Sequence, residues 1–382
     1  MMRHISSIVH VLSCILLLQF PASCGNQTSD SEIFNGEIVN IDDKDVMEKE
    51  VEFREMELKG VNYGFLSICD TLAIYMNPQL PSHWYQVFNL KSREEAGDFC
   101  MKGNGHGEFT PVVPVFNFYR EANDMKTLVF EPNKERASIW NITKSLSDGS
   151  TVVERNVRMP WMKENRGACY NEFFIKDSNT AYAKVQSIPI NEHEATLPYY
   201  QIRDLKSGEK ISDIHIFKRG IINKSTRTIP EVILNSNDVM KPDGSKIVQA
   251  MIKVPQLNII DTESKHVVAF RLDYGVSLSD LETTKVIKSY FYRICADDDY
   301  IYTVYYGKEP WEGNEPPVIN WIYVFDWNGR LISKITTKHS ISEMGVDNLN
   351  KILYTTSHTD EKLYYIKTAE LLGAPSSGSA SK

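Results

Sequence analysis

Short runs of alternating apolar and polar residues, separated by turn-forming residues, fill most of the chain. The clearest group lies between Tyr290 and Thr336 and contains four such runs. Its last two runs are joined by Asn328-Gly329, a dipeptide that favours tight hairpins because both residues tolerate positive φ. Four strands in roughly 45 residues make an antiparallel meander of the size of one β-propeller blade. This group therefore predicts a propeller.

The second strand of this group recurs along the chain. Apolar runs that follow a turn begin at Thr71, Lys126, Thr180, Lys246, Tyr300 and Lys351. Neighbouring starts are 51 to 66 residues apart, and a run suited to a third strand follows each. Six copies near one period predict an all-β fold, a six-bladed propeller of four-stranded antiparallel blades over residues 58–372. An open pair of β-sheets is the alternative for these strands.

The sixth blade lacks an outer strand of its own, since the apolar pattern stops near Leu372. The run from Val51 to Leu58 alternates apolar and polar residues with a period of two, as a half-buried strand does. We predict that this N-terminal run completes the last blade. Such closure would also cover edges that otherwise template aggregation.

Residues 1–23 have the pattern of a secretory signal. They contain Arg3, an apolar stretch from Ile8 to Phe20, and then small residues ahead of Cys24. The stretch is too short to span a bilayer comfortably. Its end resembles a bacterial lipobox, in which the cysteine thiol is lipidated and the chain is cut before it, although Pro21 stands where Leu is usual. We predict lipidation at Cys24 and durable membrane anchoring; the alternative is an ordinary secreted protein.

Residues 24–57 are strongly acidic. The whole chain has a net charge of -8, and the segment from Asp30 to Glu57 alone holds eleven acidic residues against three basic ones. Such a composition predicts a solvated spacer that repels itself and extends. Ser29-Asp30-Ser31-Glu32 also resembles the surface-export signal of some Bacteroidetes lipoproteins, which is the alternative interpretation.

The remaining body is nearly neutral, which argues against nucleic acid as a partner, because phosphate binding needs a concentrated basic face. The four body cysteines, Cys69, Cys100, Cys169 and Cys295, are widely spaced and contain no CxxC pair. We expect no zinc site and favour buried free thiols over disulfides. The Gly/Ser/Ala-rich tail 373–382 is predicted to be flexible.

The loop Gly103-Asn-Gly-His-Gly-Glu-Phe109 and the run Ser138–Ile142 that follows it resemble the TolB-like six-bladed propeller lipoproteins of Bacteroidetes. The segments Val324–Arg330 and Val346–Tyr354 are similar to the last two blades of that family. The resemblance covers nearly the whole mature chain. It implies the propeller fold and export to the cell envelope, at the outer membrane, and it implies no activity and no catalytic residue.

The chain contains none of the common catalytic or nucleotide-binding motifs, such as GxSxG, GxxxxGK[ST] or HExxH. Gly103-x-Gly105 lacks the third glycine of a dinucleotide fingerprint, and Asp297-Asp298-Asp299 lacks the spacing of a calcium loop. We therefore predict no catalytic residue, no metal site and no cofactor.

One end of the predicted propeller has the longer loops, which are where binding tends to be located. The aromatic and polar residues of these loops are the candidate ligand-binding face: His83, Trp84, His106, Arg158, Trp161, His193 and Trp311. Each Trp could equally pack its own loop onto a blade.

These features predict a lipid-anchored binding or scaffold protein of the envelope, with a glycan, a peptide or an envelope protein as its partner. The alternative is a propeller hydrolase or lyase acting on a glycan, lactone or peptide. Two carboxylates about 5 to 10 Å apart at the channel mouth would favour a glycosidase.

Overall fold

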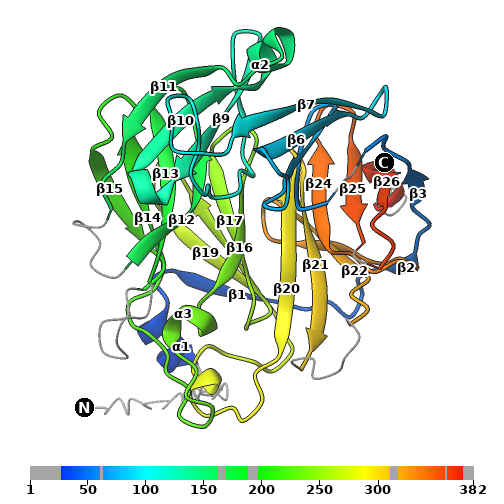
Figure 1. Cartoon of the computed structure of the whole chain (residues 1–382). Coiled ribbons are helices and arrows are strands. Elements are labelled where there is room, and N and C mark those ends of the chain that lie inside the picture. The colour runs from blue at the N-terminus through cyan, green and yellow to red at the C-terminus, as the bar shows by residue number, and fades with distance from the viewer. Residues whose placement is uncertain are drawn as a thin grey trace, which may run out of the picture.

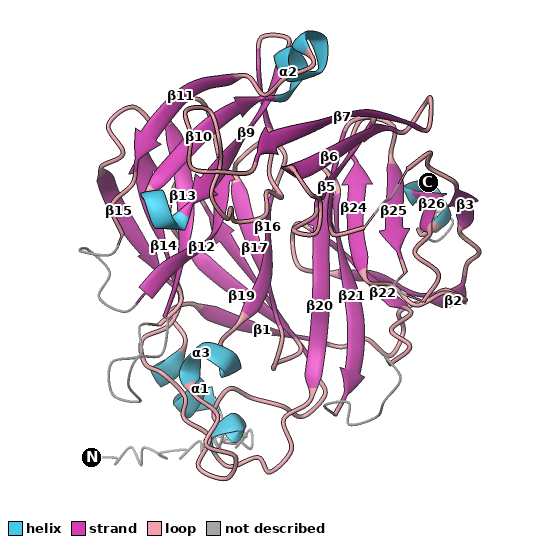
Figure 2. Ribbon diagram, in the orientation of Figure 1, coloured by secondary structure: helices cyan, strands magenta, loops and turns pink. Residues whose placement is uncertain are grey.

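The computed structural model describes residues 27–60, 63–161, 168–187, 197–309, 317–357 and 359–372. Six mainly antiparallel sheets form its body, and only short helices accompany them (Figure 1; Figure 2). The six-bladed propeller predicted from the repeat is confirmed. The predicted signal 1–23, Cys24 and the tail 373–382 lie outside the described residues.

Each blade is a meander whose strands run in chain order from the central channel outward. Blade 1 contains β4 (Phe65–Cys69), β5 (Leu72–Met76), β6 (His83–Asn89) and β7 (Glu94–Met101); blade 2 contains β8 (Tyr119–Glu121), β9 (Asp124–Glu131), β10 (Arg136–Asn141) and β11 (Val153–Arg158); blade 3 contains β12 (Ala168–Ile175), β13 (Thr180–Ser187), β14 (Tyr199–Asp204) and β15 (Lys210–His215).

The other three blades follow the same order. Blade 4 contains β16 (Ser236–Met240), β17 (Lys246–Met251), β18 (Gln256–Asp261) and β19 (Val267–Leu272); blade 5 contains β20 (Ser289–Ala296), β21 (Tyr300–Lys308), β22 (Trp321–Asp326) and β23 (Leu331–Thr336); blade 6 contains β24 (Glu343–Asp347), β25 (Ile352–Thr356) and β26 (Leu363–Lys367). The short helices are α1 (Gln27–Ile33), η1 (Pro132–Lys134), α2 (Ile142–Asp148), α3 (Pro230–Ile233), η2 (Asp280–Glu282) and η3 (Thr368–Glu370).

All six predicted second strands occupy that position, and each begins within two residues of the predicted start. The predicted hairpin at Asn328-Gly329 joins β22 to β23. Gly329 has a φ of 79°, and a Cβ there would lie 2.1 Å from the Phe270 ring, so this turn requires glycine.

The hydrophobic core is divided among the blades. Six clusters of buried side chains each fill the space between two neighbouring blades, including the space between blades 6 and 1 that closes the ring. The inner strands are covered on both faces, whereas outer strands such as β7, β11 and β15 keep exposed positions.

The N-terminal segment is wrapped around half of the ring. Strand β3 (Arg54–Met56) pairs antiparallel with β26, which confirms that an N-terminal strand completes blade 6. Strands β1 (Glu37–Ile41) and β2 (Glu48–Glu50) pair in parallel with β19 and β23 as fifth strands of blades 4 and 5 (Figure 1). From residue 27 onward the acidic segment is thus part of the folded body, in contrast to the extended spacer that its composition predicts.

Bases of the outer strands explain the difference. Lys334 Nζ lies 2.8 Å from Asp43 and 3.2 Å from Glu48, and Lys362 Nζ lies 2.7 Å from Glu55. The apolar residues of the segment pack into the clusters at the edges of blades 4 to 6. Self-repulsion of the acids is offset by charges that are far away in the sequence.

Asp30 shows how firmly this segment is held. Its side chain is buried and forms an ion pair with Arg271, with 2.5 Å between Oδ2 and the guanidinium. Its Oδ1 accepts a hydrogen bond from the backbone of Ser279. Within the stretch Ser29–Glu32, Asp30 thus faces the body of the folded protein, whereas Ser31 and Glu32 are exposed.

Candidate functional site: the central channel

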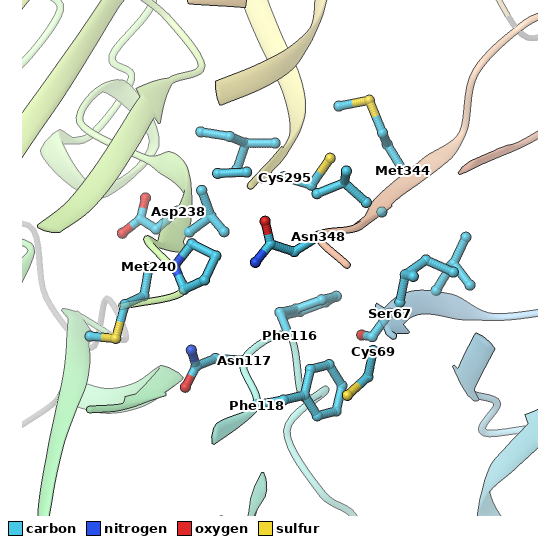
Figure 3. A pocket seen from close by; sticks show the side chains of 18 of the residues that line it. Ser67, Cys69, Phe116, Asn117, Phe118, Asp238, Met240, Cys295, Met344 and Asn348 are labelled. Atoms are coloured by element: carbon cyan, nitrogen blue, oxygen red, sulfur yellow. The ribbon is translucent and has the colours of Figure 1, made fainter. Parts of the chain in front are cut away.

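The inner strands of all six blades enclose a cavity of about 360 Å³ on the propeller axis. Figure 3 shows side chains from several blades around it, with Asn348 near its middle, Phe116 and Asn117 to one side, and Asp238 across from Cys69. The wall is largely apolar, with Met240, Met344 and the phenylalanines between scattered polar groups. Every blade contributes to it, so its shape depends on the whole ring.

A buried ionic cluster lies in the wall between blades 3 and 4. Lys184 Nζ lies 3.0 Å from Asp238 Oδ2 and 3.5 Å from Glu172 Oε2, and the three side chains are 1%, 0% and 16% exposed. Tyr200 donates its hydroxyl to the same oxygen of Asp238. One ammonium thus faces two carboxylates at a depth where water solvates them poorly.

This arrangement shifts the protonation of the cluster. Burial raises the pKa of Glu172, the ammonium of Lys184 opposes the rise, and the carboxylate of Asp238 adds to it, with a net value of about 7. With Glu172 protonated, the cluster holds one positive and one negative charge and is balanced. A buried carboxylate that lacks a counter-charge of its own usually binds a proton and becomes neutral.

Arg293 borders both this cavity and a second one. It lines the central cavity and also a cavity of about 370 Å³ where the inner strands of blades 1 and 6 begin. Its guanidinium donates to Glu343 Oε1 at 2.7 Å, and Phe65 lies beside it in the second cavity. Arg293 thus lines both cavities, and Glu343, its partner in the ion pair, lines the second.

The opposite end of the central cavity is formed by the turns between first and second strands. Arg120 of blade 2 pairs with Asp70 of blade 1 there. Asn348 of blade 6 donates to Asp298 at 2.8 Å and accepts from Lys351. Asp70 and Asp298 at this end have a cationic or amide partner, and Glu172 and Asp238 in the wall share Lys184.

Two of the thiols, Cys69 and Cys295, also line the cavity. All four body cysteines are free thiols; Cys169 is half-buried and the others are buried, as predicted. Burial raises the pKa of Cys69 to about 12, and the pKa of Cys295 also lies above its usual range because of burial. Such thiols are neutral and unreactive at physiological pH.

The predicted long-loop residues lie elsewhere. Trp84 donates its indole N–H to the carbonyl of Phe109, and Lys102 Nζ lies 4.5 Å from its ring centre. Trp161 donates to the carbonyl of Pro132 and packs between blades 2 and 3. In both residues the indole N–H is used to hold a loop.

The remaining predicted residues are dispersed. His83 contacts Ser82 through Nδ1, His106 is exposed at the tip of the glycine loop, and Arg158 forms an exposed ion pair with Glu135. His193 and Trp311 lie outside the described residues. None of the described members of the predicted face lines the central cavity.

The glycine loop that carries the family resemblance has a structural use. Glu108 folds back so that Oε2 accepts from the backbone of Gly105 at 2.7 Å. A Cβ at Gly103, where φ is 155°, would lie 1.9 Å from the same carboxylate. Arg136 of blade 2 donates to the Glu108 carbonyl and covers the Phe109 ring. The loop thus ties blade 1 to blade 2.

The channel groups could have been found from one sequence signal. Glu172, Lys184, Asp238 and Arg293 are charged residues within the first or second strands of their blades, where most neighbouring side chains are buried. The sequence does not indicate, however, that the first three meet one another.

No protein-family model matches the chain, and no curated protein matches it. A solved structure of a DUF4221 family member from Bacteroides vulgatus is similar over 83% of this chain and 97% of its own, with a TM-score of 0.56 and 16% identity. A provisionally assigned exported protein from Bacteroides fragilis covers 83% of this chain and 88% of its own at 12% identity, with a TM-score of 0.49.

Within the described residues, no helix has the length and apolarity needed to cross a membrane. At such identities a structural likeness establishes shape alone. What this chain shares with the Bacteroides vulgatus protein is the fold, and the chain is a six-bladed β-propeller with four-stranded antiparallel blades.

Proposed function

We propose that this chain is an exported lipoprotein, anchored through Cys24 at the outer membrane, that binds a small ligand in its central channel. The observation that carries the binding role is the cavity of about 360 Å³ enclosed by the inner strands of all six blades. Cavities of this size, mostly apolar with a few placed polar groups, are typical of small-molecule sites.

The lining suits a short glycan or peptide. Phe116 is 36% exposed and offers an apolar surface, while Asn237 supplies an amide group on blade 4. The lipobox-like sequence and the resemblance to TolB-like envelope lipoproteins support export and anchoring.

Binding fits the charged groups better than catalysis does. A general acid and base must be free to exchange protons with a substrate. Here Asp238 is fully buried beside Lys184 and Asp70 is engaged by Arg120, which leaves Glu172, with its pKa of about 7, as the lining carboxyl suited to proton exchange. A hydrolase or lyase therefore stays the second reading, to be tested by turnover of any ligand found.

The test is a thermal-shift screen of the mature chain against short glycans and peptides, with two matched variants. Phe116→Ala removes an aromatic wall of the central cavity, and Phe65→Ala removes a ring of similar exposure, 38%, from the second cavity. A ligand present at 100 times its Kd stabilises the fold by about 2.7 kcal/mol. We expect Phe116→Ala to reduce that shift and Phe65→Ala to leave it unchanged.

The reverse pattern would place the ligand in the second cavity. Loss of the shift only on replacing Trp84 and Trp161 would restore the long-loop face as the site. If no glycan or peptide shifts the melting temperature, the channel proposal fails and an envelope protein becomes the expected partner.

Anchoring is tested separately. We expect the mature N-terminal peptide to carry acyl chains on Cys24, measured by mass spectrometry, and the protein to be extracted from membranes only by detergent. An unmodified N-terminus beginning at another residue would show ordinary secretion.

A further inference from the structure

Three segments meet at the end of the propeller where the N-terminal helix lies. They are residues 27–36, the link 216–235 between blades 3 and 4, and the link 273–288 between blades 4 and 5 (Figure 1, bottom). We call them the platform. Ile33 accepts from the backbone of Lys218, and the side chain of Asn223 donates to the carbonyls of Leu281 and Thr284.

The platform is built as one unit. Ile33, Phe34, Phe217, Leu234 and Leu281 belong to a single buried cluster between blades 3 and 4. The Asp30–Arg271 ion pair fixes the helix to blade 4. The outer surface of the platform therefore has a defined shape and does not depend on loose loops.

That surface combines aliphatic and basic side chains. Ile222, Val232 and Val286 are 54%, 44% and 47% exposed. Five exposed bases surround them: Lys218, Lys224, Arg227, Lys285 and Lys288.

The acids of the platform do not cancel these charges. The three segments hold six acids and six bases, but most of the acids are withdrawn from the surface: Glu282 is paired with Arg219, Asp30 is buried beside Arg271, and Asp280 is half-buried. Glu231 is buried as well, so only Glu32 and Asp273 are exposed. Exposed bases thus outnumber exposed acids on the platform, although the whole chain has a net charge of -8.

We propose that the platform docks onto a bilayer surface bearing anionic phospholipid headgroups, with Ile222, Val232 and Val286 reaching its interface. Aliphatic side chains among bases are the features that bind a folded protein to such a surface, each base contributing about fivefold in affinity. The end of the propeller that holds the second cavity then faces the lipid. The mouth of the central cavity, at Asp70 and Arg120, faces away from it.

The position of the N-terminal segment supports a bilayer surface as the binding partner of the platform. Only two residues, Gly25 and Asn26, lie between Cys24 and Gln27, the first residue of α1. The three Cα–Cα steps from Cys24 to Gln27 span at most about 11 Å, close to the distance of about 8 Å over which charges act at physiological salt. A lipid on Cys24, which belongs to the proposed function, would hold the platform against the membrane.

The experiment uses the mature chain from residue 24 with Cys24→Ser, so that no acyl chain contributes. Co-sedimentation with phosphatidylglycerol vesicles is compared with that on phosphatidylcholine vesicles. The platform variant is Lys224→Gln/Arg227→Gln/Lys288→Gln, whose side chains make no ion pair among the described residues. The matched control is Lys91→Gln/Lys206→Gln/Lys367→Gln, three exposed lysines at the opposite end.

We expect binding to phosphatidylglycerol that weakens with salt, a loss on the order of a hundredfold in the platform variant, and no change in the control. Ile222→Asn/Val286→Asn should also weaken binding, whereas Leu349→Asn, 71% exposed at the other end, should not. Equal losses in platform and control variants, or no binding to phosphatidylglycerol, would overturn the proposal.

Hydrogen exchange of the same Cys24→Ser protein on these vesicles gives a second readout. Protection confined to residues 216–235 and 273–288 supports docking; protection of the turn 348–351 instead refutes it. Because this measurement needs no lipid on Cys24, its result is independent of whether the chain proves to be lipidated.

Discussion

Two lysines of this propeller each face two carboxylates, at different depths. Lys184 lies with Glu172 and Asp238 beside the channel, and none of the three side chains is more than 16% exposed. Lys126 of blade 2 lies 2.6 Å from Glu121 and also pairs with Glu154; these carboxylates are 49% and 25% exposed. Both clusters join one lysine to two carboxylates, but the cluster at Lys126 is more open to water, and Asn141 and Lys144 also donate to its Glu154.

The difference in depth reverses the sign of the pKa shift. At Glu172 the cost of burial exceeds the attraction of the lysine, and the pKa rises. At Glu154 burial also raises the pKa, but the bonds from Lys126, Asn141 and Lys144 outweigh it, and the value falls to about 2. Burial thus dominates at Glu172, whereas access to water and the additional donors Asn141 and Lys144 keep Glu154 ionised.

Replacing each lysine should give the largest difference in the free energy of unfolding between the two clusters. Lys184→Met leaves two buried carboxylates without a cation, and we expect a loss of about 3–5 kcal/mol in the free energy of unfolding. Lys126→Met should cost only about 1 kcal/mol, because water and Lys144 can serve the exposed carboxylates. Urea unfolding of both variants measures the two values, and equal losses would contradict the comparison.

The second-largest difference between the two clusters should be in how pH changes the free energy of unfolding. The carboxyl of Glu172 has an ordinary pKa of 4.5 when unfolded and a raised one when folded, so it stabilises the fold below pH 4.5 and this contribution is lost as pH rises towards 7. Glu172→Gln removes the titration. Denaturant unfolding from pH 4.5 to 7 should therefore show the wild type losing stability relative to the variant, and parallel curves would exclude a raised pKa.

Glu154 should behave in the opposite way and with a smaller effect, since it is partly solvated. Its lowered pKa stabilises the fold above pH 4.5, and the contribution is lost as pH falls from 4.5 towards 2. The wild type should lose stability relative to Glu154→Gln on acidification. A constant difference between the two across this range would show that the carboxyl is not held ionised.

The repeat made the architecture predictable because every second strand has the same surroundings. Starts such as Thr180, Lys246 and Tyr300 are exact in the structure. The closing strand near Val51 was predictable for the same reason, as alternation reports one buried face. Both are local patterns that repeat or alternate along the chain.

The channel and the N-terminal segment depend on pairs distant in sequence. Nothing near Asp43 indicates that Lys334, almost 300 residues later, will neutralise it. Trp84 and Trp161 were chosen as exposed binding aromatics, but the carbonyls that accept their N–H groups belong to other loops. Side-chain environment follows from which strands the ring brings together, and composition does not contain that information.

The smallest expected effect concerns the edge of the N-terminal segment. Lys338 lies 3.3 Å from Glu52, and their side chains are 69% and 78% exposed. Lys338→Ala should lower the free energy of unfolding by less than about 1 kcal/mol, because water solvates both partners and salt screens them. The same substitution in high salt should have no measurable effect. A loss as large as that of Lys126→Met would mean that the segment is held mainly by its surface charges, whereas a negligible loss assigns its attachment to the strand pairing of β3 and to the buried side chains of Phe53 and Met56.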